Sequence, residues 1–94
     1  MPSKGSTHLE VRGRVQGVGF RWYVMELARD LKLAGWVKNR PDGIVEIAAA
    51  GEPDALAKLE VAVAAGPPGA HVEEMRKLGE VPADSLQVPF GIVR

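Results

Sequence analysis

The chain has 94 residues, of which 46% are hydrophobic and 26% charged, and its 12 lysines and arginines balance its 12 acidic residues. This composition is that of one small soluble domain. The absence of cysteine excludes disulfides, thiolate metal sites and cysteine nucleophiles, and the zero net charge argues against a general nucleic-acid binder. No apolar run is long enough for a membrane helix, and the first residues lack the apolar core of a signal peptide. We therefore expect a cytoplasmic protein with a flexible tail over residues 1–7 and one domain over residues 8–94.

The charges are unevenly distributed along the chain. Residues 1–40 hold eight lysines and arginines against three acidic residues, whereas residues 41–94 hold four against nine. If this division persists in the folded protein, the basic half would steer a small anionic substrate. The alternative is that folding mixes the two halves and removes the asymmetry.

The first half of the chain predicts a strand, a helix and a hairpin. Apolar and polar residues alternate over residues 9–15, which is typical of a half-buried strand. A helical stripe follows, and we expect Met25 and Trp22 to cover the core edge beside it and Gly35 to end the helix as a left-handed cap. Residues 36–50 predict two strands joined by a turn at residues 40–43. The members of the helical stripe are Phe20, Val24, Leu27, Ala28 and Leu31.

The second half predicts a helix followed by strands. Pro53 suits a first helical position, and Leu56, Leu59 and Val63 would face the core. The apolar residues of segment 72–78 are spaced as in a helix, but we interpret it as a strand because the architecture needs a partner there. Residues 82–85 are expected to be a loop, and residues 88–92 a short edge strand marked by Pro89.

The order of these elements is β-α-β-β-α-β with a short additional strand. That order is the ferredoxin-like split βαβ arrangement, an α+β fold in which two helices cover one face of an antiparallel sheet. The first two strands would run in the same direction, with the third between them.

A glycine-rich segment, residues 13–21, joins the first strand to the first helix. Its three glycines allow positive φ angles, so several N–H groups can point into one concavity that suits an anion. The helix adds the positive end of its dipole, and Arg21 adds a planar fork that matches phosphate oxygens. We interpret the segment as a phosphate cradle. The alternative is an ordinary turn with a solvated arginine.

The second strand ends at Asn39, which the predicted topology places near this segment. Two strand spacings separate the ends of the first two strands by roughly 10 Å. An amide side chain both accepts and donates hydrogen bonds, so Asn39 could hold a water opposite a bound phosphate. Alternatively, its side chain caps the hairpin turn.

Two stretches of the sequence resemble the signatures of the acylphosphatase family. Residues 11–21, VRGRVQGVGFR, resemble the first signature, and the second is similar to Gly35-Trp36-Val37-Lys38-Asn39 followed by Gly43, Val45 and Gly51. The resemblance implies hydrolysis of a small acyl phosphate to a carboxylate and inorganic phosphate, without a metal or organic cofactor. It implies that Arg21 binds phosphate and Asn39 orients water. The amides that it implies for the cradle are those of Gln16, Gly17, Val18, Gly19 and Phe20.

The resemblance and the chain size also lead to expectations about partners. Inorganic phosphate or sulfate should compete with the substrate, and the protein should be a monomer that binds neither nucleic acid nor membrane. His8 and His71 lie outside both signatures and are expected to be surface residues.

Two other functions are open to a chain of this fold. One is a non-catalytic module that binds an acyl or carbamoyl phosphate, such as a detached relative of the acylphosphatase-like domain of hydrogenase-maturation carbamoyltransferases. The presence of both Arg21 and Asn39 favours turnover over that module. The other is an RNA-binding domain, which is disfavoured because the first and third strands carry no aromatic residue on which bases could stack.

Overall fold

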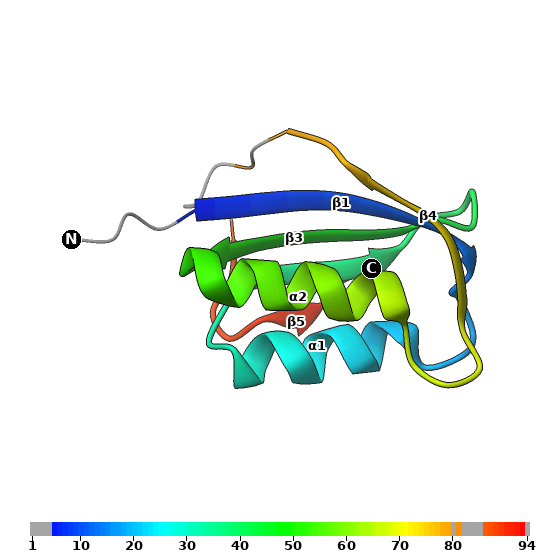
Figure 1. Cartoon of the computed structure of the whole chain (residues 1–94), viewed down its shortest axis with the longest axis horizontal. Coiled ribbons are helices and arrows are strands. Elements are labelled where there is room, and N and C mark those ends of the chain that lie inside the picture. The colour runs from blue at the N-terminus through cyan, green and yellow to red at the C-terminus, as the bar shows by residue number, and fades with distance from the viewer. Residues whose placement is uncertain (1–4, 80, 82–85, 94) are drawn as a thin grey trace.

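A computed structural model describes residues 5–79, 81 and 86–93 of the chain. Two helices lie on one face of a five-stranded sheet, and the other face of the sheet is open (Figure 1). The elements in chain order are β1 (Gly5–Arg14), α1 (Phe20–Asp30), β2 (Ala34–Asn39), β3 (Val45–Gly51), α2 (Pro53–Ala65), β4 (His71–Lys77) and β5 (Gly91–Ile92).

The strands are arranged in the order β4-β1-β3-β2-β5. β3 is antiparallel to both β1 and β2, so those two strands run in the same direction with β3 between them, as predicted. β4 pairs antiparallel with the outer edge of β1, and β5 pairs parallel with β2. The ferredoxin-like fold class is confirmed, although the β2–β5 pair makes the sheet mixed rather than wholly antiparallel.

The core lies between the sheet and the two helices. Alternate residues of β1 and β3, such as Leu9, Val11 and Ile47, are fully buried and face the helices. They pack with fully buried side chains of both helices, including Val24 and Leu59. The period of two in the strands and the 3.6-residue period in the helices therefore point their apolar faces at the same core.

The end of α1 differs from the expectation. The helix stops at Asp30, and Lys32 takes the positive φ of 59° in the loop that follows. Gly35 lies inside β2, where φ is 138° and a Cβ atom would be 1.9 Å from the carbonyl oxygen of Ala48 on β3. The predicted role of Gly35 as a helix cap was wrong, because this glycine allows close backbone approach between two strands.

The burial of residues on α1 agrees with the prediction except at Trp22. Phe20, Val24 and Ala28 are buried as predicted, and Met25 covers the edge of the core. Trp22, however, is 59% exposed. The prediction that Trp22 would cover the core edge was wrong, because the core-facing stripe leaves this side chain on the outer face of the helix.

The two ends of the chain also depart from the sequence-based boundaries. β1 begins at Gly5 and pairs with β3 from Gly5↔Gly51 onward, so residues 5–7 are strand rather than tail; residues 1–4 lie outside the described part. Towards the C-terminus, only Gly91–Ile92 of the expected strand pairs with β2, at the sheet edge. The expected loop over residues 82–85 lies outside the described residues.

Candidate active site

The register of the strands brings the C-terminal ends of β1 and β2 to the same end of the sheet. Val11 of β1 and Asn39 of β2 both pair with Val45 of β3, from opposite sides. Two strand spacings, or roughly 10 Å, separate their backbones. β1 continues to Arg14 and then leads into the glycine-rich loop, and this loop and the β2–β3 hairpin lie at the same end of the molecule (Figure 1).

The loop over residues 15–19 holds its shape through positive φ angles. Val15 is buried and anchors its start, whereas Gly17 and Gly19 have φ angles of 76° and 78° and are exposed. A Cβ at either glycine would meet no atom within 4 Å, so what requires glycine there is the backbone angle and not crowding. The loop can therefore curl with its main chain open to solvent.

Helix α1 begins where this loop ends, and its N-terminus is not capped by a side chain. Gly19 occupies the N-cap position, and the first turn contains no acidic residue. The first main-chain bond runs from the Tyr23 N–H to the Gly19 carbonyl, which leaves the preceding amides of the turn without intrahelical partners. These amides and the helix dipole favour an anion at this position.

Arg21 lies in the first turn of α1 and is partly exposed. Among the described residues, no ion pair or side-chain hydrogen bond includes it. Its positive charge is therefore not paired with any carboxylate of the described residues and adds to the field of the helix terminus.

Asn39 ends β2, and its side-chain oxygen Oδ1 is buried without a hydrogen-bond partner in the described structure. The hairpin turn is closed by other groups: Arg40 N–H donates to the Ile44 carbonyl at 2.8 Å, and Ile44 N–H donates to Asp42 Oδ1 at 3.2 Å. Asp42 thus performs the capping role that was the alternative for Asn39. A buried amide oxygen without a partner is uncommon, and this one is available to accept a hydrogen bond from a ligand or a water molecule.

Gln16 is the functional candidate whose side chain sequence reasoning missed. Gln16 was expected to contribute only its main-chain N–H to the cradle. In the structure, its side-chain Nε2 also donates to the carbonyl oxygens of Arg40 at 2.9 Å and Ile44 at 3.2 Å. These partners lie 24 and 28 residues away in sequence, so no local pattern signals the contact. The side chain ties the glycine-rich loop to the hairpin that carries Asn39.

Arg40 directly follows Asn39 but directs its charge elsewhere. Its guanidinium hydrogen-bonds to Glu10 of β1 and, at 2.8 Å, to Asp42 of the turn. The hydrogen bond to Glu10 and the nearby charge of Asp42 raise the pKa of Arg40 above its ordinary value. Arg40 therefore fastens the hairpin turn to β1 and is neutralised there.

Several charged strand side chains form ion pairs on the open face of the sheet. His8 Nε2 lies 2.6 Å from Glu46, and Lys38 lies 3.8 Å from the same carboxylate; Arg12 lies 3.4 Å from Glu74. These pairs join the basic first half of the chain to the acidic second half, so folding mixes the two. Of the two alternatives left open by the sequence, these pairs favour the one in which folding mixes the two halves. His71 is exposed, and His8 is partly exposed on this face.

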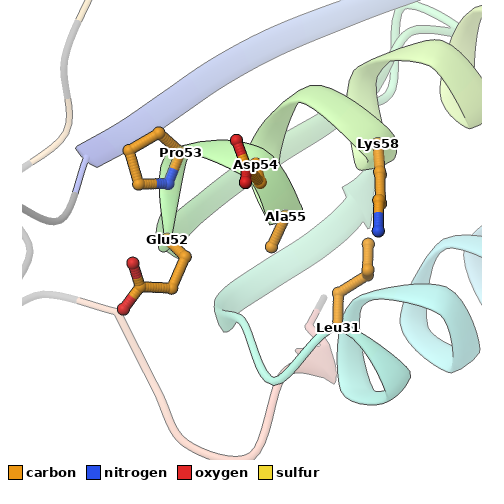
Figure 2. Close-up of a pocket in the computed structure, with 6 residues that line it drawn as sticks. All are labelled: Leu31, Glu52, Pro53, Asp54, Ala55 and Lys58. Carbon is orange, nitrogen blue, oxygen red and sulfur yellow. The ribbon is translucent and has the colours of Figure 1, made fainter. Parts of the chain in front are cut away.

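A hollow of about 440 Å³ lies at the other end of α1, beside the N-terminus of α2 (Figure 2). None of the predicted site residues lines it; its lining residues are Leu31, Glu52, Pro53, Asp54, Ala55 and Lys58. In the described part of the chain, no three histidine or acidic side chains gather closely enough to hold a metal ion. No described helix has the length and apolar character that crossing a membrane requires.

Comparison with known proteins places this chain in a family. The Acylphosphatase family model matches residues 7–90. An acylphosphatase of Lacticaseibacillus paracasei is 50% identical over 82 residues, covering 84% of this chain and 88% of the relative. The crystal structure of acylphosphatase from Bacillus subtilis superposes with a TM-score of 0.88 at 41% identity, covering 98% of this chain and all of the other.

A much longer protein also contains this fold. The crystal structure of full-length HypF in the phosphate- and nucleotide-bound form matches with a TM-score of 0.81 at 26% identity, but the match covers only 12% of that chain. The acylphosphatases match over nearly their whole length and at higher identity, so they are the better guide to function. The chain belongs to the acylphosphatase family.

Proposed function

We propose that this protein hydrolyses acyl phosphates at the loop between β1 and α1, with the end of β2 supplying the water-orienting group. The main-chain amides of residues 16–20 and the Arg21 guanidinium hold the phosphoryl oxygens, and Asn39 orients the attacking water. Family membership supports the reaction. The observation that supports the residue roles is the register in which Val11 and Asn39 flank Val45.

The reaction needs positioning and charge stabilisation more than acid catalysis. An acyl phosphate is a mixed anhydride, so the bond between phosphorus and the acyl oxygen breaks with the electron pair leaving on a stable carboxylate. The water oxygen forms the new bond to phosphorus on the opposite side. The water proton passes to a phosphate oxygen or to solvent, because the amide of Asn39 is not basic. The products are a carboxylate and inorganic phosphate.

The protein's fixed charges suit the phosphoryl group. The uncapped start of α1 presents amides and a positive dipole end, and Arg21 adds a full charge. Charge on the non-bridging oxygens shifts during in-line attack, and donors fixed beforehand stabilise that shift without reorganising. The buried, unpartnered Oδ1 of Asn39 suits an acceptor for a hydrogen of the attacking water.

The proposal extends to a monomer in the cytoplasm. The long free edge of the sheet is β4, and five of its seven residues are exposed and carry charged or imidazole side chains: His71, Glu73, Glu74, Arg76 and Lys77. Charged edges discourage pairing between copies of a chain. Neither the non-catalytic module nor RNA binding is favoured by the comparisons, which match the acylphosphatases most fully.

The assignment is tested by replacing the two proposed catalytic residues. Arg21→Ala and Asn39→Ala are each expected to lower kcat/KM for benzoyl phosphate by about 10²-fold or more, because each removes a group that stabilises the transition state. Arg21→Lys is expected to fail as well, since a point charge does not reproduce the guanidinium fork.

The matched control is Arg76→Ala, an exposed arginine on β4, which should retain full activity. Urea unfolding of each variant verifies that the fold persists. Full activity in Arg21→Ala would overturn the assignment of the anion site to this loop, and full activity in Asn39→Ala would overturn the assignment of the water-orienting group.

A further inference from the structure

The side chain of Gln16 connects the two halves of the proposed site. We infer that Gln16 is a positioning residue, whose side-chain amide holds Asn39 in line with the phosphate-binding loop. The inference rests on the proposed roles of the loop and of Asn39. It concerns the side chain and is separate from any contact that the main-chain amide of Gln16 makes with phosphate.

The chemistry of the contact calls for a primary amide. Nε2 carries two hydrogens, and it faces two carbonyl oxygens, those of Arg40 at 2.9 Å and Ile44 at 3.2 Å. Each carbonyl already accepts one main-chain hydrogen bond inside the turn, from Gly43 N–H and Arg40 N–H respectively. Gln16 therefore occupies the second acceptor position of both oxygens. A carboxylate would oppose oxygen to oxygen, and an apolar side chain would leave both positions unused.

The contact adjoins Asn39 at the last residue pair of β2 and β3, which is Asn39↔Val45. Arg40 follows Asn39 directly, and Ile44 precedes Val45, the ladder partner of Asn39. Gln16 thus bonds to the two turn residues that directly adjoin the Asn39–Val45 pair. The Arg40 guanidinium holds the same turn to β1 through Glu10. Two side chains therefore hold the end of β2 in place: Gln16 of the glycine-rich loop and Glu10 of β1.

The glycine-rich loop is the segment that most needs a contact to hold it in position. Beyond Gln16, Gly17 and Gly19 place positive φ angles in an exposed stretch of main chain. The loop sets where phosphorus lies, whereas Asn39 sets where the water lies, and in-line attack requires these to be aligned. A misplacement of about 1 Å can lower a rate by about 10²-fold. Gln16 links the two groups across 23 residues of chain.

The test separates chemistry from anion binding. In Gln16→Met, a side chain of similar length lacks both donors, and kcat for benzoyl phosphate is expected to fall about 10-fold to 100-fold. The inhibition constant of inorganic phosphate should change by less than about threefold, because the main-chain amides and Arg21 remain. Gln16→Asn, which keeps the amide but is too short to reach, should show the same division. Gln87→Met changes an exposed glutamine outside the loop and should leave both constants unchanged.

A double-mutant cycle with Asn39→Ala decides whether Gln16 acts through Asn39. We expect Gln16→Met to cause no further loss of kcat in the Asn39→Ala background, since the group that it positions is gone. If the two losses multiply, or if Gln16→Met weakens phosphate binding as much as it lowers kcat, the inference is wrong while the proposed function stands. If Asn39→Ala alone keeps full activity, the proposed function itself fails. Urea midpoints of both Gln16 variants identify the folded ones for this comparison.

Discussion

At the scale of single residues, the glycines divide by what makes them necessary. Gly35 has a φ of 138° in β2, and an added Cβ would lie 1.9 Å from the Ala48 carbonyl oxygen, in the backbone of the paired strand. Gly43 has a φ of 91° in the hairpin turn, but a Cβ there would meet no atom within 4 Å. One position requires glycine for space and for angle, the other for angle alone.

This difference predicts unequal effects on stability. Gly35→Ala is expected to lower the free energy of unfolding by about 3 kcal/mol or more, because strands β2 and β3 must separate locally to admit the methyl group. Gly43→Ala should lower it by only about 1 kcal/mol, the usual strain of an alanine at positive φ. Urea denaturation followed by circular dichroism measures both, and equal losses would contradict the backbone contact.

At the scale of elements, the pair of Arg40 and Glu10 is one of the ion pairs that join the β2–β3 hairpin to β1. Arg40 and Glu10 have side chains that are 31% and 12% exposed, whereas the side chains of Arg12 and Glu74, joining β1 to β4, are 48% and 51% exposed. Removing one partner of a pair matters most when the remaining charge is shielded from water. The two pairs therefore provide a matched comparison.

Arg40→Ala is expected to lower the urea midpoint clearly more than Arg12→Ala does, because it leaves the Glu10 carboxylate without its main partner. Arg12→Ala should change the free energy of unfolding by less than about 0.5 kcal/mol, as is typical of an exposed pair. Raising the salt concentration should shrink the smaller effect first. Equal midpoints for the two variants would show that the Arg40 contact does not stabilise the hairpin.

The elements were predictable wherever local patterns determine them. The turn at residues 40–43, the helix start at Pro53 and the buried faces of both helices followed from proline, glycine and apolar spacing. β4 followed only from the architecture, since its apolar residues are spaced as in a helix. The misassigned role of Gly35, the exposure of Trp22 and the parallel pairing of β5 depend on which segments become neighbours in space, and short-range patterns do not contain that information.

At the scale of the whole molecule, 12 lysines and arginines balance 12 acidic residues, but the described ion pairs are unevenly distributed over the molecule. The ion pairs neutralise cations on the open face of the sheet, whereas Arg14 and Arg21, on either side of the loop, take part in none of the pairs among the described residues. The positions of Asn39 and the loop could be predicted from topology. The tie through Gln16 could not, because it joins segments far apart in sequence.

This charge distribution predicts inhibition by simple anions. Inorganic phosphate and sulfate should each compete with benzoyl phosphate, raising KM without lowering kcat, because they occupy the same amides and guanidinium. Sodium chloride at matched ionic strength is the control, and it should have the weaker effect, acting by screening alone. Inhibition that is absent at high phosphate, or that is not competitive, would argue against an anion site at the loop.

The two tryptophans of the chain lie in contrasting surroundings, and this has a practical consequence for observing the site optically. Trp22 is exposed one position after Arg21, whereas Trp36 lies on the open sheet face with its ring centre 6.1 Å from that of His8. In Trp36→Phe, the remaining indole should report sulfate binding as a saturable change in fluorescence, with a midpoint equal to the inhibition constant. A fluorescence intensity and emission maximum that do not change through that concentration range would argue against an anion site at the first turn of α1. Such a change would make Trp22 an intrinsic label by which anion occupancy can be followed without turnover.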